Sequence, residues 1–145
     1  MNKKSEWSSF GSALEAARRK PGLYEIRMGE VLLKVGIASN LQRRLRQHAR
    51  SSQKRLKSLV GSKTGKRRLP SEVASKGSIL AKHLYFDRSV TRNYDLRTED
   101  GRRSFLENQC QVRFQETGTR DEAKRRERNL EATKKYRYVG RVIAR

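Results

Sequence analysis

Two short β-prone runs, residues 23–27 and 31–35, dominate the hydrophobic pattern near the start of the chain. Between them Met28-Gly29-Glu30 supplies the glycine that a reversal needs, so the pattern predicts a β-hairpin. If the turn is centred on Gly29, Tyr24 lies opposite Lys34. Directly opposed residues project from the same face of a sheet, and the sequence therefore predicts a phenol held beside an ammonium group.

After Gly36 the chain is expected to turn, and the residues that follow have the spacing of a helix. Ser39 and Gln42 have the spacing of a capping box, which predicts the start of a helix. Residues at positions i, i+3, i+4 and i+7 then share one stripe that should face the sheet, namely Leu41, Arg44, Leu45 and His48. Two polar residues on an apolar stripe mark it as a candidate for chemistry.

A second mixed stripe lies near the end of the chain. Residues 110–115 alternate between apolar and polar side chains, which predicts a third, half-buried strand. Thr119 and Glu122 repeat the capping-box spacing at the start of a last helix. Glu127 shares a face of that helix with Ala123 and Leu130, and so places an acid where an apolar residue is expected.

The middle of the chain carries a weaker pattern. It predicts a helix that starts near Ser71 and ends near Phe86, a loop from Asp87 to Asp100, and a short helix capped by Thr98. His83 is expected to be a packed or surface residue. The predicted fold class is α/β: a small, mainly antiparallel three-stranded sheet flanked by helices, in a single domain with a helical or loop insertion.

Charge changes this picture. Among 145 residues, 36 Lys and Arg stand against 15 Asp and Glu, a net charge of +21, and no acidic residue occurs between Glu30 and Glu72. Such a one-signed segment favours nucleic acid as partner, with DNA expected in preference to RNA. The candidate nucleic-acid-binding residues are Arg43, Arg46, Arg50, Lys54, Arg55, Lys57, Lys63, Lys66, Arg67 and Arg68.

Other classes of protein are disfavoured. The single Cys110 excludes an internal disulfide, and no Cys/His spacing is typical of a zinc site. No apolar run approaches the roughly 18 residues of a membrane span, and a membrane partner is not expected. Without a recognisable signal peptide the expected location is the cytoplasm.

Three motifs carry a resemblance to a known family. Gly22-Leu23-Tyr24, then Lys34-Val35-Gly36, then the helix with Arg44 resemble the signature of the GIY-YIG nuclease superfamily. The segment around Glu127, followed by Lys135-Tyr-Arg-Tyr138, is similar to the helix that carries this family's metal-binding glutamate. Lys34 stands where most members of the family have tyrosine; some restriction-enzyme branches also have lysine at this position. Val139 stands where many members have asparagine.

Apolar spacing after a candidate serine cap predicts residues 1–20 as an N-terminal helical extension. The resemblance implies residues 21–145 as a nuclease domain with an insertion at about 50–108. It implies a metal-dependent endonuclease that hydrolyses DNA phosphodiester bonds. Glu127 would hold Mg²⁺ or Mn²⁺. The implied catalytic residues are Tyr24, Lys34, Arg44, His48 and Glu127.

Two versions of the chemistry are open. In both, Arg44 stabilises charge on the phosphate and Tyr24 orients or deprotonates a water. In the first version Lys34 favours the phenolate of Tyr24; in the second Lys34 binds phosphate and His48 relays the proton. The alternative function is a non-catalytic basic DNA- or RNA-binding module that keeps the fold, and a third is an RNA-directed basic protein of a larger assembly.

Overall fold

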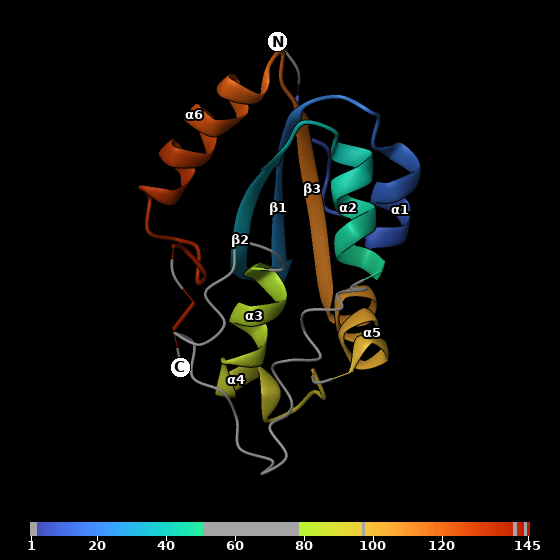
Figure 1. The fold of residues 1–145 in the computed structure, drawn as a ribbon, viewed down its shortest axis with the longest axis vertical. Coiled ribbons are helices and arrows are strands. Elements are labelled where there is room, and N and C mark those ends of the chain that lie inside the picture. The colour runs from blue at the N-terminus through green and yellow to red at the C-terminus, as the bar shows by residue number, and fades with distance from the viewer. Residues whose placement is uncertain (1–2, 51–78, 97, 141, 144) are drawn as a thin grey trace, which may run out of the picture. The chain divides into compact units, whose positions relative to one another are not determined.

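The computed structural model describes residues 3–50, 79–96, 98–140, 142–143 and 145. The chain divides into two compact units, Met1–Arg50 with Leu106–Arg137 and Ser51–Phe105 with Tyr138–Arg145. The second unit overlaps the stretch predicted as an insertion. The elements of the first unit are α1 (Phe10–Ala16), β1 (Gly22–Met28), β2 (Val31–Ala38), α2 (Leu41–Arg50), β3 (Cys110–Glu116) and α6 (Arg120–Glu131) (Figure 1).

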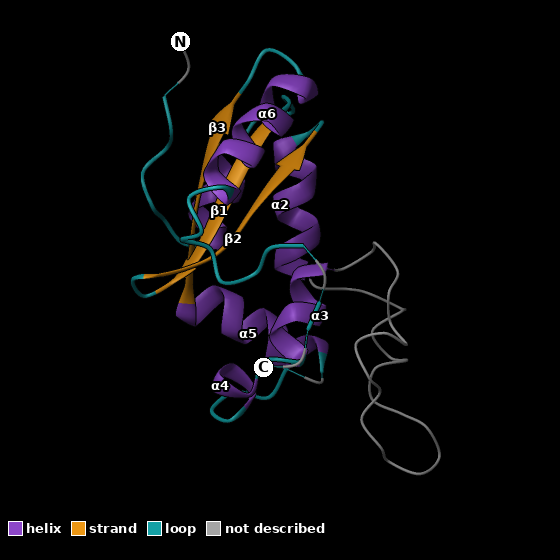
Figure 2. Cartoon of the chain, turned by 90° about the vertical axis from the view of Figure 1, so that its left-hand side faces the viewer, coloured by secondary structure: helices purple, strands orange, loops and turns teal. Residues whose placement is uncertain are grey.

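The first unit is built on a three-stranded antiparallel sheet in the order β2-β1-β3 (Figure 2). This sheet and its flanking helices confirm the predicted fold class. The chain ahead of α1 runs beside β3, where Ser8 and Val112 exchange backbone hydrogen bonds of 3.0 and 2.8 Å. A fourth segment thereby covers the outer edge of β3, which would otherwise expose unpaired backbone groups.

The hairpin differs from the prediction in its register. Met28 pairs with Val31, so the turn consists of Gly29 and Glu30, and Gly29 has the positive φ of +58° that glycine adopts without strain. An irregularity between Ile26 and Arg27 then shifts the pairing by one further residue. Tyr24 consequently lies opposite Gly36, and the predicted pairing of Tyr24 with Lys34 is wrong. Strand β2 also continues through Gly36 to Ala38, where a turn was expected.

Helix α2 packs on the sheet face that carries Tyr24. Leu41, Leu45 and His48 are buried, which confirms the predicted stripe. The cap is a different residue from the one predicted: the Oδ1 of Asn40, and not the side chain of Ser39, accepts the backbone N–H of Arg43 at 3.0 Å. Asparagine and serine are about equally good N-caps, so the sequence alone did not separate them.

Helix α6 covers the opposite face of the sheet. Leu130 packs there against a buried cluster of Leu23, Val35 and Tyr136. The helix begins as predicted, because the hydroxyl of Thr119 accepts the N–H of Glu122 at 3.1 Å. The two faces of β1 are thus covered by different helices, α2 and α6.

The second unit contains α3 (Ile79–Tyr85), α4 (Arg88–Thr91) and most of α5 (Glu99–Gln109). The loop predicted from Asp87 onward is wrong in its first part, because the buried carboxylate of Asp87 caps α4 and accepts the hydroxyl of Tyr138 at 2.7 Å. His83 is buried and stacks on Tyr138 at 4.9 Å between ring centroids. The predicted helix start near Ser71 lies outside the described residues.

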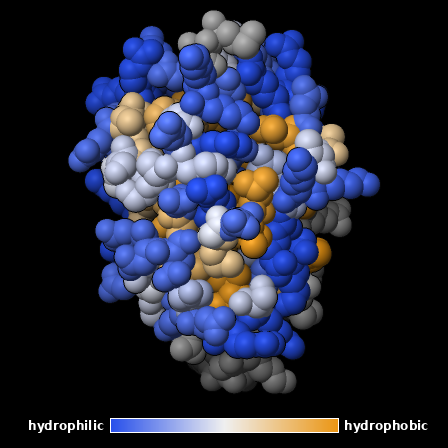
Figure 3. Space-filling view, turned by 180° about the vertical axis from the view of Figure 1, so that it is seen from behind, coloured by the Kyte–Doolittle hydropathy of each residue, from blue (hydrophilic) through white to orange (hydrophobic). Residues whose placement is uncertain are grey.

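Hydrophilic side chains cover most of the face seen in Figure 3, with hydrophobic residues gathered toward its middle. This agrees with a chain in which 35% of residues are charged. Among the helices that the structure describes, none has the length and apolar character to cross a bilayer.

Candidate active site

Tyr24 is 1% exposed and its ring lies directly over Gly36 on the neighbouring strand. A Cβ atom added to residue 36 would come within 2.4 Å of both the phenol oxygen and the adjoining ring carbon. Any larger residue at position 36 would therefore have to displace the ring. The glycine of the second motif makes room for the tyrosine of the first.

Two residues of α2 contact the Tyr24 hydroxyl. The Nε of Arg44 donates to the phenol oxygen at 3.3 Å, and the Nε2 of His48 lies 2.7 Å from it. A guanidinium has donors only, so the phenol oxygen accepts from Arg44. We assign the phenol hydrogen to the bond with His48, which makes Nε2 the acceptor and leaves the imidazole proton on Nδ1.

Burial holds the tyrosine and the histidine in their neutral forms. It lowers the pKa of His48 to about 3, and the positive charges of Arg44 and Lys34 act in the same direction. Burial also raises the pKa of Tyr24, against an opposing effect of Arg44. The predicted phenolate promoted by Lys34 is therefore wrong for this state: Arg44 is the cation beside the phenol, and burial outweighs it.

Arg44 is held from a second side by its own helix. Its Nη1 donates to the Oε1 of Gln47 at 3.3 Å. Together with the bond to Tyr24, this engages only part of a group that carries five N–H donors. The half-buried guanidinium thus has capacity to donate to a further anion.

Lys34 and Glu127 interact electrostatically across the sheet edge. Burial lowers the pKa of Lys34, while Glu131 and Glu127 raise it. Burial and Glu131 raise the pKa of Glu127, while Lys34, Arg120 and Lys124 lower it. Both groups are thus shifted toward their neutral forms, which is common at functional sites.

A salt bridge to a neighbouring cation would give Glu127 a purely structural role. Within the described residues Glu127 forms no ion pair, and Arg126 is instead bonded to Glu122 at 3.0 Å and to Gln115 at 3.2 Å. The half-buried carboxylate of Glu127 is therefore not neutralised by a neighbouring cation at bonding distance.

The donor set fits a loosely held divalent cation. No group of three or more His, Cys, Asp or Glu side chains able to hold a metal occurs in the part of the chain that the structure describes. Mg²⁺ is commonly bound by one or two carboxylates, with water and substrate phosphate in its other positions. Glu127, with no ion-pair partner among those residues and Glu131 one turn later, suits that mode.

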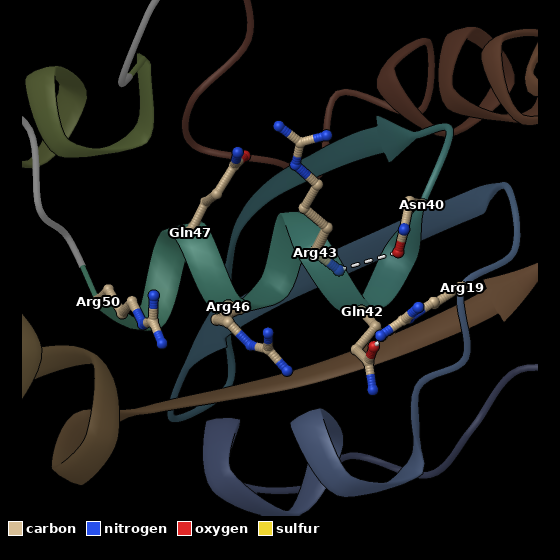
Figure 4. Close-up of a pocket in the computed structure, with 7 residues that line it drawn as sticks. All are labelled: Arg19, Asn40, Gln42, Arg43, Arg46, Gln47 and Arg50. Atoms are coloured by element: carbon tan, nitrogen blue, oxygen red, sulfur yellow. Dashed lines mark hydrogen bonds between the residues drawn. The ribbon is translucent and has the colours of Figure 1, made fainter.

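The five candidate catalytic residues all lie in the first unit, and the structure links each of them to at least one other by a hydrogen bond or an electrostatic interaction. Of the candidate nucleic-acid-binding residues, Arg43, Arg46 and Arg50 line a pocket of about 410 Å³ on α2 (Figure 4). The others, Lys54, Arg55, Lys57, Lys63, Lys66, Arg67 and Arg68, lie outside the described residues.

The hydrophobic pattern gave no indication that the acid Glu25 is buried. It is 1% exposed on the sheet face opposite Tyr24, where its carboxylate accepts from Arg113, from the hydroxyl of Tyr136 and from Lys4, the last at 3.4 Å. The available signal was one acid between the apolar residues Tyr24 and Ile26 of a β-prone run. Its partner Arg113 comes from a strand 88 residues away, so no local pattern joins them.

No protein-family model matches the chain. A search of curated proteins found no match either. Among solved structures the chain is similar to three crystal structures of the GIY-YIG N-terminal endonuclease domain of UvrC from Thermotoga maritima, two of them point mutants. All three are bound to the domain's catalytic divalent cation, which is magnesium in one.

The sequence identities are 14–15%, the matches cover 90–91% of this chain and 96% of the UvrC domain, and the TM-score is 0.48.

Proposed function

We propose that this chain is a metal-dependent endonuclease that hydrolyses phosphodiester bonds of DNA. The observation that carries the proposal is the Tyr24 hydroxyl, which is buried between a fixed guanidinium and a neutral imidazole. Lys34 and Glu127 also influence this group electrostatically, because Lys34 lowers the pKa of His48 and Glu127 raises the pKa of Tyr24. This arrangement supplies a proton path, positive charge and one carboxylate, which are the groups that hydrolysis of a phosphodiester needs.

The proton path follows from the two bonds of Tyr24. An attacking water gives a proton to the phenol oxygen while the phenol gives its own hydrogen to Nε2 of His48. The water oxygen bonds to phosphorus as the bond from phosphorus to one sugar oxygen breaks, and that leaving oxygen takes a proton from solvent. Tyr24 stays neutral throughout, which suits a phenol with a raised pKa. This is the second of the two versions drawn from the sequence, with His48 as the final acceptor.

Substrate binding increases the basicity of His48. In the free protein Arg44 and Lys34 add to the effect of burial and hold its pKa down. A phosphate that contacts Arg44 and Lys34 brings negative charge next to these cations and offsets their effect on the imidazole. His48 therefore becomes a better proton acceptor once DNA is in place.

Arg44, Lys34 and Glu127 have separate tasks. Arg44 donates its remaining N–H groups to the non-bridging oxygens, where charge develops, and Lys34 contributes a second positive charge. Glu127 is the residue that would hold Mg²⁺ or Mn²⁺. The cation, when bound, supplies Lewis-acid stabilisation of the phosphate oxygens.

The proposal is tested by incubating supercoiled plasmid and branched DNA with the native chain, Glu127→Ala and Arg44→Ala in Mg²⁺. Glu107→Ala and Arg92→Ala remove equivalent charges from exposed positions and are the matched controls. We expect cleavage by the native chain and both controls, abolished by EDTA, and none by the two site variants. DNA binding should persist in Glu127→Ala.

Binding without cleavage by the native chain, on every substrate and with either cation, would overturn the nuclease assignment. The function would then be that of a basic nucleic-acid-binding module. That alternative is favoured by one observation, the row of arginines on the exposed side of α2.

A further inference from the structure

Helix α2 carries two different functional surfaces. A helix turns by about 100° per residue, so Arg43, Arg46 and Arg50 point away from the side that carries Arg44 and His48. Figure 4 shows the three arginines spread over the side of α2 turned away from the sheet. Together with Arg19, Asn40, Gln42 and Gln47 they line the pocket of about 410 Å³, here called the arginine groove.

The arginine groove presents hydrogen-bond donors almost exclusively. Four of its seven residues are arginines, and none is acidic. Neither Arg43 nor Arg46 forms an ion pair with any carboxylate of the described residues. The guanidinium groups of Arg43 and Arg46, which have no carboxylate partner among these residues, are suited to an anionic ligand that only accepts, such as a phosphodiester.

The three carboxamide side chains of the groove also present hydrogen-bond donors to a ligand. The oxygen of Asn40 accepts the N–H of Arg43 at 3.0 Å, and that of Gln42 accepts from Arg19 at 3.4 Å. The oxygen of Gln47 accepts from Arg44 at 3.3 Å. With each oxygen occupied by a protein donor, the amide NH₂ groups are the parts left to meet a ligand.

The dimensions fit one strand of a duplex. Arg43 and Arg50 are seven residues apart, which along a helix axis is about 10 Å. One strand of B-DNA advances about 3.4 Å along the duplex axis per phosphate, so a helix lying along that axis would span roughly three phosphates with these two arginines. The opposite side of α2, with Arg44, lies about one helix diameter away, roughly 10–12 Å. That is comparable to the ~12 Å width of the major groove, which separates two backbones.

We propose that the arginine groove binds the backbone of a second DNA strand, complementary to the strand held at Tyr24. This inference rests on the proposed function for the identity of the first strand. Gln47 joins the two surfaces, because it lines the groove and also bonds to Arg44. The protein would therefore bind double-stranded DNA in preference to single strands, with no base-specific contact required.

The test compares binding of duplex and single-stranded DNA without divalent cations, so that cleavage does not interfere. The variant is Arg43→Gln/Arg46→Gln, and the control Arg88→Gln/Arg92→Gln removes the same charge from exposed residues of α4 and its C-cap. The groove variant should bind duplex several-fold more weakly, with a salt slope shallower by about 2. Its single-strand affinity, and the duplex affinity of the control, should stay near native.

Equal losses in the groove variant and the control would show that only net charge matters, and would overturn the inference. An equal loss on duplex and single strands would also overturn it, because the groove would then serve the first strand. The nuclease proposal would fail separately, if the plasmid assay showed no cleavage. The comparison of duplex with single-strand binding could still be interpreted in that case, because it does not depend on cleavage.

Discussion

Neighbouring residues of β1 bury polar side chains on opposite faces of the sheet, and the two clusters differ in how their charges are treated. Glu25 is fully buried, yet its carboxylate is bonded to Arg113, Tyr136 and Lys4. Burial alone would raise its pKa, but the bonds from Arg113 and Tyr136 lower it. The groups bonded to Glu25 therefore favour the ionised form of its carboxylate.

The cluster around Tyr24 is arranged in the opposite way. Burial lowers the pKa of His48 and of Lys34, and raises the pKa of Glu127 and of Tyr24 itself. Each group is thus shifted toward its neutral form, at a cost to stability that no internal ion pair offsets within the described residues. The comparison separates a buried charge that its neighbours bond, as in a structural ion pair, from groups shifted toward their neutral forms, which is a common feature of functional sites.

The largest expected effect on stability comes from breaking the Glu25 cluster. Glu25→Ala leaves a half-buried guanidinium and a buried hydroxyl without their acceptor, and should lower the free energy of unfolding by about 3 kcal/mol. Glu116→Ala is the matched control, since Glu116 also forms a two-bond pair with an arginine, but the side chain of that partner, Arg18, is 68% exposed. Urea unfolding should show a far smaller change for the control; equal changes would mean that burial of the pair is unimportant.

A smaller effect, in the Tyr24 cluster, depends on pH. The folded pKa of His48 is about 3, below the ordinary 6.5. Between these values the unfolded chain binds a proton that the folded chain does not, so stability is lost as the pH falls below about 6.5. His48→Gln removes this contribution and keeps an acceptor for the Tyr24 hydroxyl.

The native chain should therefore lose about 2 kcal/mol more stability than His48→Gln between pH 7 and pH 5, as an order-of-magnitude figure. Denaturant unfolding at the two pH values measures this difference. The contribution of Glu25 is common to both proteins and cancels. A difference that is independent of pH would show that His48 is not held neutral by the fold.

Helical periodicity found the candidate site because spacing encodes which side chains share a face. Arg44 and His48 fell on the stripe with Leu41 and Leu45, and their burial against Tyr24 follows from that pattern. Glu127 was found in the same way. Sequence alone identified these positions, although the chain is only 34% hydrophobic.

The errors concern features that spacing does not encode. The register of the hairpin depends on a two-residue turn and on the irregularity after Ile26, and a shift of this kind changes every partner along a strand. Lys34 therefore lies opposite Ile26, and not opposite Tyr24 as predicted. Glu25 was missed because its partners Arg113 and Tyr136 are remote in sequence, and only the folded sheet brings them together.

The most direct test of the contrast between the two clusters is the single-turnover cleavage rate of Tyr24→Phe and of Tyr136→Phe in Mg²⁺. Each substitution keeps a ring and removes one buried hydroxyl, from the Tyr24 cluster or from the Glu25 cluster. We expect Tyr24→Phe to cut at least about 100-fold more slowly, and Tyr136→Phe to cut at close to the native rate. Native-rate cleavage by Tyr24→Phe, or an equal loss in both variants, would contradict the assignment of Tyr24 as the residue that handles the water proton.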